Sequence, residues 1–322
     1  MKRLVGPLLC LLALAAVAPG LSAQSPPSAP IRVVIAFPPG AAHDMLGRSI
    51  VAEFGKGYAP GSIAENKPGG GTVIATSDVA RATPDGRTLL MVGFPFPLIN
   101  SMHTQSKIDV LRDFVPVVNV MQAPNALIVR ADSPFKSLQQ LLAHAKANPG
   151  VVKYASVGDG SSPHLGMELL KQRAGVDITM VPYKGSAPAL TDLMGGHVDV
   201  MFDNLPNVVP RLQNGQLRAL AITSAARSST VPDVPTMAEG GVADYVMNIW
   251  FGVAAPAGTP PATVAALNAE INRMIGRPDF SERFTRGGLE MVGGTPDAFG
   301  KVIAQDVALW SKVLDALGLK QK

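Results

Sequence analysis

The chain has 322 residues, of which 47% are hydrophobic and 16% charged, with a formal net charge of +4. That length is enough for one large domain or two medium ones with a substantial core. Basic residues form no cluster with interleaved aromatic side chains, so nucleic acid is not an expected partner. The five histidines are scattered without metal-binding spacing. The sequence therefore predicts no metal site, and no cofactor motif is present.

Residues 1–23 are predicted to be a signal peptide that is removed from the mature protein. Two basic residues precede an apolar h-region at 8–17 and a small-residue cleavage site ending at Ala23, with cleavage after Ala18 as the alternative. The apolar run is shorter than the roughly 20 residues that a membrane helix needs. Cys10, the only cysteine, lies in the h-region. We therefore expect an exported, periplasmic mature protein without cysteine.

The mature chain begins with a predicted strand–turn–helix unit. Residues 31–36 favour a strand, and Phe37-Pro-Pro-Gly-Ala-Ala-His-Asp44 forms the turn. Apolar residues at fourfold spacing from Leu46 predict the buried stripe of the following helix, which Asp44 is expected to cap. A strand at 88–92 then leads into Gly93-Phe-Pro-Phe-Pro97, which should reach the same edge of the sheet.

Three extended segments suggest that the chain passes twice between two lobes. Residues 115–120 and 126–130 are rich in branched side chains and are separated by Pro124-Asn125, where we place the first crossover; residues 245–254 form the expected return. The predicted lobe bounds are 24–123 with 246–322 for lobe 1, and 124–245 for lobe 2.

The most informative stretch is Tyr154-Ala-Ser-Val-Gly-Asp-Gly-Ser-Ser-Pro-His164. It follows a strand-like run and opens a helical pattern, with Pro163 suited to a first helical position. The first amides of a helix lack partners inside it, and the helix dipole there attracts negative charge. Ser161 and Ser162 add hydroxyl groups. Taken alone, this stretch is more typical of an ordinary capped helix than of a binding site.

The same arrangement recurs, which favours a binding site. A strand at 178–183 is followed by Lys184-Gly-Ser-Ala-Pro-Ala189 and another helix, and the unit at 31–54 has the same form. Ligands of open α/β sheets bind outside the carboxyl ends of the strands. The three loops are therefore predicted to converge on one small anion.

Catalytic motifs are missing from the sequence. It contains no G-x-S-x-G elbow, no phosphate-binding loop and no dinucleotide fingerprint. An enzyme that uses His164 beside Ser161 or Ser162 is the alternative, but residues so close at a helix start do not readily orient as nucleophile and base. His164 and Glu168, one helical turn apart, are expected to pair structurally. The protein is predicted not to be an enzyme.

A series of short motifs resembles the Bug-type extracytoplasmic solute receptors, the substrate-binding subunits of tripartite tricarboxylate transporters. The resemblance extends from about residue 31 to the C-terminus. The motifs include Phe37-Pro-Pro-Gly40, Glu65-Asn-Lys-Pro-Gly69, Val181-Pro-Tyr-Lys-Gly185, Trp250-Phe-Gly252 and Ala255-Pro-Ala-Gly-Thr-Pro260. It implies an α/β fold of the type II-like periplasmic binding protein, or Venus flytrap, kind: two lobes joined by two crossover strands, with a ligand in the cleft.

The resemblance also implies a set of ligand contacts made by loop amides, hydroxyls and ordered water. The matching positions are Phe37, Gly40, Ala41, Ala42, Ser156, Ser161, Ser162, His164, Gly185, Ser186, Ala187 and Asp203. Two positions depart from the family pattern: Ala41 replaces a glycine, and Phe94-Pro-Phe96 replaces a segment that often contains Thr-His. Phe94 therefore joins the expected contacts, and a ring facing the ligand favours an aromatic or medium-chain acid over citrate. The alternative is that Pro95 and Pro97 turn the rings of Phe94 and Phe96 into the lobe core.

The expected partners follow from this resemblance. The ligand is a small carboxylate, and the protein partners are the membrane subunits of a tripartite tricarboxylate transporter. A sensor protein that reads the ligand-bound receptor is the alternative. The receptor itself is expected to be a monomer.

Overall fold

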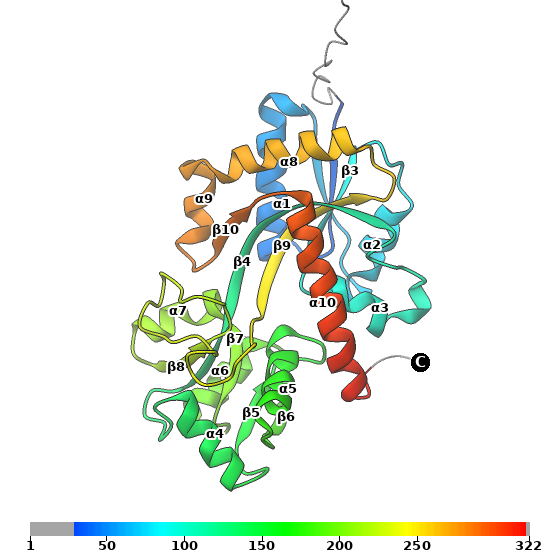
Figure 1. Ribbon diagram of the computed structural model, residues 1–322. Coiled ribbons are helices and arrows are strands. Elements are labelled where there is room, and N and C mark those ends of the chain that lie inside the picture. The colour runs from blue at the N-terminus through cyan, green and yellow to red at the C-terminus, as the bar shows by residue number, and fades with distance from the viewer. Residues whose placement is uncertain (1–28, 320–322) are drawn as a thin grey trace, which may run out of the picture.

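The computed structural model describes residues 29–319, so the predicted signal peptide lies outside the described part. Two α/β lobes are stacked in Figure 1, and the long strands β4 (Phe114–Arg130) and β9 (Asn248–Pro256) run between them. This is the two-lobe architecture with two crossover strands that the sequence predicts. No helix within residues 29–319 has the length and apolarity required to cross a membrane.

Lobe 1 is built on a mixed sheet with the strand order β10-β4-β9-β3-β1-β2. The strands that complete it are β1 (Arg32–Ile35), β2 (Ile63–Asn66), β3 (Thr88–Gly93) and β10 (Glu290–Gly293). Strand β1 pairs in parallel with β2 and β3, whereas β9 is antiparallel to β3 and β4. The carboxyl ends of β1 and β3 therefore lie at one edge, where the chain enters the loops after residues 35 and 93.

Helices cover both faces of this sheet. They are α1 (Ala42–Glu53), α2 (Val73–Ala80), α3 (Ile99–Met102), α8 (Pro261–Ile275), α9 (Pro278–Thr285) and α10 (Pro296–Ala316), with short turns η1 (Phe54–Tyr58), η2 (Gly70–Thr72), η3 (Phe96–Leu98) and η4 (Thr104–Ser106). The predicted apolar stripe of α1 is buried, since Leu46, Ile50 and Phe54 are fully covered.

Lobe 2 uses the second half of β4, which pairs with β7 (Met201–Asn204) and β8 (Leu217–Ile222). The parallel pair β5 (Lys153–Ser156) and β6 (Thr179–Pro182) lies beside them, and an isolated parallel bridge joins Tyr154 to Val200. The helices of this lobe are α4 (Leu138–Ala147), α5 (Ser162–Ala174), α6 (Ser186–Gly195) and α7 (Leu205–Gln213). The carboxyl ends of β5, β6 and β7 face lobe 1.

The first crossover is one continuous strand, not the two separated segments that the sequence suggested. Pro124 still pairs with Asn248 of β9, and Asn125 already pairs with Asn204 of β7. Pro124 has no amide hydrogen that would need a ladder partner, and the Asn125 amide donates to Thr223 Oγ1 at 2.8 Å. The strand therefore changes partners here without a break. The exact lobe bounds stay a prediction.

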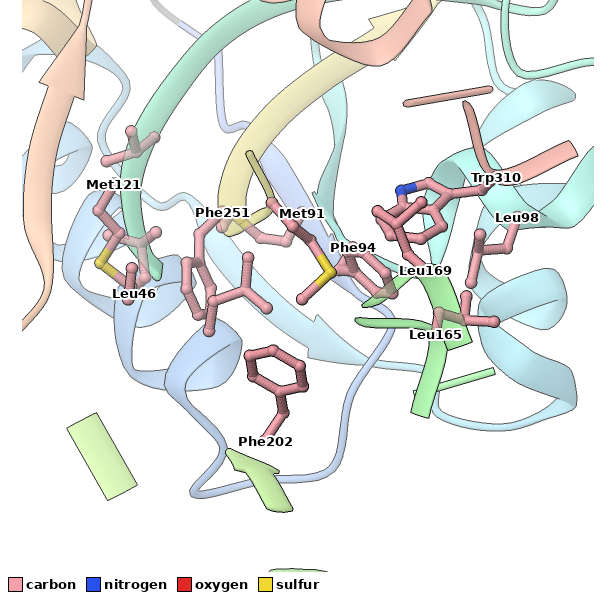
Figure 2. Close-up of a cluster of buried hydrophobic side chains, with 14 of the residues drawn as sticks. Leu46, Met91, Phe94, Leu98, Met121, Leu165, Leu169, Phe202, Phe251 and Trp310 are labelled. Atoms are coloured by element: carbon pink, nitrogen blue, oxygen red, sulfur yellow. The ribbon is translucent and has the colours of Figure 1, made fainter. Parts of the chain in front are cut away.

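The core is continuous between the lobes. Figure 2 shows Phe94, Leu98 and Trp310 beside Leu165 and Leu169 of α5, and all five side chains are buried in one cluster. Trp310 belongs to α10, which runs from the upper lobe of Figure 1 to α5 in the lower lobe. Buried residues of α10 thus pack against both lobes.

Candidate functional site

A pocket of about 310 Å³ lies between the lobes, where the crossover strands pass. Lobe 1 lines it with residues of α1, β9 and the loop after β3, and lobe 2 lines it with the starts of α5 and α6 and the end of β7. Three of the lining segments are helix starts: Ala42 with His43, residues 160–163, and Ser186. Unpaired amides and the positive ends of three helix dipoles meet at one place, which suits an anion.

At the start of α5, most of the polar groups are already used within the protein. Ser161 is the N-cap: its hydroxyl accepts from the His164 amide at 3.3 Å and donates to the Gly158 carbonyl at 2.7 Å. Pro163 occupies the second helical position, not the first as predicted, and has no amide hydrogen. The amide of Ser162 is therefore the one that this helix start offers to a ligand.

His164 supports the loop and does not line the pocket. Its side chain is buried, and Nδ1 accepts the Gly160 amide hydrogen at 3.2 Å. Burial lowers the pKa of His164, which keeps Nδ1 available as an acceptor. The expected pairing with Glu168 is wrong, because Glu168 instead accepts from Tyr154 Oη at 2.7 Å and from Lys171 Nζ at 3.0 Å. The imidazole does not contact a serine hydroxyl as a general base would.

Asp203 and Ser186 form the polar part of the wall in lobe 2. Asp203 is fully buried, and its Oδ1 accepts from the Asn204 amide, Asn207 Nδ2 and Ser186 Oγ at 2.7 to 3.2 Å. Its Oδ2 has no partner in the described chain. Desolvation raises the pKa of Asp203 in spite of these hydrogen bonds. The upward shift disfavours the ionised form, which is the form that would repel a bound carboxylate.

The wall in lobe 1 is mostly aromatic. Phe94, Trp250 and Phe251 line it, and Phe94 packs edge-on against Trp310 with 5.3 Å between ring centroids. Phe96 turns into the lobe core instead, against Phe114. Of the two phenylalanines singled out in the sequence, only Phe94 therefore offers its ring to the pocket.

His43 completes this wall and was not among the expected contacts. Its ring stacks on Phe37 with 3.6 Å between centroids and lies 4.4 Å from the ring of Phe251. Burial lowers the pKa of His43 from 6.5 to about 3, so the imidazole is neutral. Among the described residues, the pocket lining contains no lysine or arginine. An anion there would be held by neutral donors.

The structure brings six of the thirteen expected contacts to the pocket lining: Ala42, Phe94, Ser161, Ser162, Ser186 and Asp203. The other seven lie outside it: Phe37, Gly40, Ala41, Ser156, His164, Gly185 and Ala187.

Local packing explains several of these positions. Phe37 lies behind the His43 ring. Asp44 does not cap α1 as predicted; Ala41 is the N-cap, and Asp44 Oδ2 accepts the Gly40 amide at 2.9 Å. Ser156 is buried at the end of β5.

Several lining residues were missed by the sequence analysis, chiefly His43, Asn204, Trp250 and Phe251. Trp250 and Phe251 belong to a motif that carried the family resemblance, and Asn204 ends the same strand as Asp203. The motif and the strand position were signals that could have identified these residues, but only the packing shows that they face the pocket.

Larger hollows of about 530 and 400 Å³ lie on the surface of lobe 2, around Arg173 and Arg218. They lie away from the converging helix starts, so we assign the site by its chemistry and not by volume. Within residues 29–319, no group of three or more acidic, histidine or cysteine side chains is arranged to hold a metal ion.

Comparison with known proteins identifies the class. A family model described as "Tripartite tricarboxylate transporter family receptor" matches residues 47–319. Protein BugT of Bordetella pertussis is 37% identical, over 100% of this chain and 99% of its own.

Two solved structures are similar over nearly their whole length. One, from R. palustris with adipate, is 35% identical with a TM-score of 0.74 and covers 91% of this chain and 98% of its own. MatC from Rhodopseudomonas palustris, with bound malate, is 31% identical with a TM-score of 0.71 and covers 89% and 99%.

The chain therefore belongs to the tripartite tricarboxylate transporter receptor family, the Bug-type periplasmic solute receptors. It is a solute-binding receptor and not an enzyme.

Proposed function

We propose that this receptor captures a small carboxylate between its lobes in the periplasm and delivers it to the membrane subunits of a tripartite tricarboxylate transporter. The observation that carries the proposal is the convergence of three helix starts on one pocket. The pocket volume of about 310 Å³ suits a small organic acid. Relatives with bound adipate and malate support the same ligand class.

We further propose that the apolar wall sets the choice among carboxylates. Phe94, Trp250 and Phe251 offer apolar area, and an aromatic contact contributes about 0.5–1.5 kcal/mol beyond burial. An aromatic or medium-chain mono- or dicarboxylate fits this wall better than citrate, whose extra hydroxyl and charge would lose water without replacement hydrogen bonds.

Mass spectrometry of small molecules released from the denatured, purified protein tests the ligand class directly. A thermal-shift panel of carboxylates then ranks them, because a ligand that binds only the folded state raises the melting temperature according to its affinity. We expect a carboxylate in the released fraction and the largest shifts from aromatic or medium-chain acids. Citrate as the best ligand would contradict the selectivity, and a panel without any shift would contradict the carboxylate proposal.

A ligand-dependent signalling role is the second candidate, because a receptor surface for a sensor and one for a transporter carry the same sequence signals. Affinity purification of the ligand-bound protein from membranes separates the two. Recovery of transporter subunits supports uptake, and recovery of a sensor protein without them supports signalling.

A further inference from the structure

We propose that His43 and Asn204 form a pair of side-chain donors, one from each lobe, that selects ligands with acceptor oxygens at both ends. The inference rests on the proposed function and adds the residues that read the two ends of the ligand.

Most hydroxyl groups that line the pocket already donate their hydrogen within the protein. In lobe 2, the hydroxyls of Ser161 and Ser186 donate to the Gly158 carbonyl and to Asp203 Oδ1. The Ser162 hydroxyl lies 3.1 Å from Asn204 Oδ1 and 3.4 Å from Asn125 Oδ1, so its hydrogen is also used. Three hydroxyls that look like ligand donors in the sequence are therefore engaged inside the protein.

Asn204 remains available on the lobe 2 side. Its Oδ1 faces the Ser162 hydroxyl, which orients the amide and directs Nδ2 away from that contact. Nδ2 makes no hydrogen bond within residues 29–319, and it is not among the side-chain nitrogen and oxygen atoms of that range that are buried without a partner. Asn204 lines the pocket, so this N–H group is a donor without a partner in the protein.

On the lobe 1 side, only His43 and Trp250 bring side-chain nitrogen to the lining. Trp250 Nε1 is occupied, since it donates to Asp306 Oδ2 at 2.7 Å. His43 Nε2 is buried without a partner. Nδ1 is not among the atoms buried in this way, and it makes no hydrogen bond in the described chain. The tautomer with its hydrogen on Nδ1 therefore places the single N–H of the neutral ring where a ligand can accept it.

The ring of His43 is also held in a fixed position. Phe37 and Phe251 pack against it. The Nε2 edge of the ring lies against Gly93, where a Cβ atom would be 2.1 Å from Nε2. The packing fixes the donor before the ligand arrives, which reduces the entropy lost on binding.

The test compares ligands matched in length: succinate, adipate and suberate against butyrate, hexanoate and octanoate, measured by calorimetry. For the dicarboxylate of best-fitting length, we expect binding to the wild type at least about tenfold tighter than its monocarboxylate, as a hydrogen bond to a charged group supports. His43→Leu should remove that preference by weakening the dicarboxylate while changing the monocarboxylate little. His43→Asn, which keeps an N–H group near Nδ1, should retain most of it.

Two further variants keep the test decisive if His43→Leu does not fold. Gly93→Ala should displace the imidazole and lower dicarboxylate affinity without changing the chemistry of the ring. Asn204→Leu should remove the preference from the opposite wall, since the Ser162 hydroxyl retains Asn125 Oδ1 as an acceptor. His144→Leu, at an exposed site on α4, is the control and should bind like the wild type.

The outcomes separate this inference from the proposed function. If no carboxylate binds the wild type, the proposed function fails. If carboxylates bind but the preference for dicarboxylates is absent, or survives in His43→Leu and Gly93→Ala, the donor pair is wrong and the proposed function stands.

Discussion

Single side chains in this pocket differ in whether their hydrogen-bonding groups are already used. Short hydroxyl side chains at a helix start reach nearby backbone and carboxyl groups, so Ser161 and Ser186 bond within the protein. The imidazole of His43 and the amide of Asn204 have an accessible nitrogen without such a partner. Residue type therefore predicts which groups can donate, and packing decides which of them a ligand meets.

Ser162→Ala tests the role of one engaged hydroxyl. The change removes the hydrogen bond that orients the Asn204 amide, so we expect ligand affinity to fall by about 0.5–1.5 kcal/mol, the contribution of a neutral hydrogen bond. Calorimetry on the variant and the wild type measures the loss, and the melting temperature without ligand should change little. An unchanged dissociation constant would show that Ser162 does not influence binding.

At the scale of elements, β9 and α10 hold the aromatic wall in place. Strand β9 supplies Trp250 and Phe251 to the pocket, and α10 packs behind it through Phe299 and Asp306. Two close contacts between these elements lead to predictions about stability.

Gly252 in β9 leaves no room for a side chain. A Cβ atom there would lie 2.2 Å from Phe299 Cζ and 2.9 Å from the Val118 carbonyl oxygen. We expect Gly252→Ala to lower the free energy of unfolding by about 1–3 kcal/mol or more. Gly300→Ala in α10 is the matched control: its nearest neighbour is 3.5 Å away, and helix propensity should stabilise the protein by about 0.5–1 kcal/mol. Urea unfolding of both variants tests the pair, and equal effects would contradict the argument.

Asp306 makes stability depend on pH. Burial raises its pKa from 3.8 to about 6, although the Trp250 N–H bond opposes the shift. The folded state then holds the proton more tightly than the unfolded chain does. Protonation of Asp306 therefore adds its full contribution to the free energy of unfolding below pH 3.8, and that contribution is lost as the pH rises through about 6.

Asp306→Asn should abolish the fall in stability as the pH rises, because the amide does not ionise, while the Asn oxygen can still accept from Trp250 Nε1. Relative to the wild type, the variant should gain about 1–3 kcal/mol between pH 4 and pH 7. Denaturant unfolding across this range measures the difference, with Asp297→Asn, exposed on the same helix, as the control. Parallel stability profiles for the wild type and Asp306→Asn would refute the assignment.

At the scale of the whole molecule, β4, β9 and α10 connect the two lobes. Trp310 packs with the α5 residues Leu165 and Leu169 and with Phe94 of the pocket wall, so one apolar cluster joins the pocket wall to α10 and α5. The contacts made by α10 are thus part of the structure that places the two pocket walls opposite each other.

We expect export to produce a monomeric mature chain that begins near Gln24. The basic n-region and the small-residue site at Ala23 direct the cleavage, and the alternative site is after Ala18. Intact-mass measurement of the secreted protein locates the cut, and analytical ultracentrifugation measures the assembly state. A soluble mature protein that retains residues 1–23, or a stable dimer, would contradict this expectation.

Local sequence rules were sufficient for the repeated strand–turn–helix units, because periodicity, glycine turns and capping act over a few residues. Capping is local in the same way at Ser137, whose hydroxyl accepts from the Gln140 amide three residues on. The motifs also indicated the receptor family. The roles of Phe94, Phe96, His43 and Asn204 could not be read in this way, because they depend on neighbours remote in sequence, such as Trp310, Phe114, Phe251 and Ser162. Only the tertiary packing, by burying some polar and aromatic groups and leaving others at the pocket wall, decided which of them line the pocket.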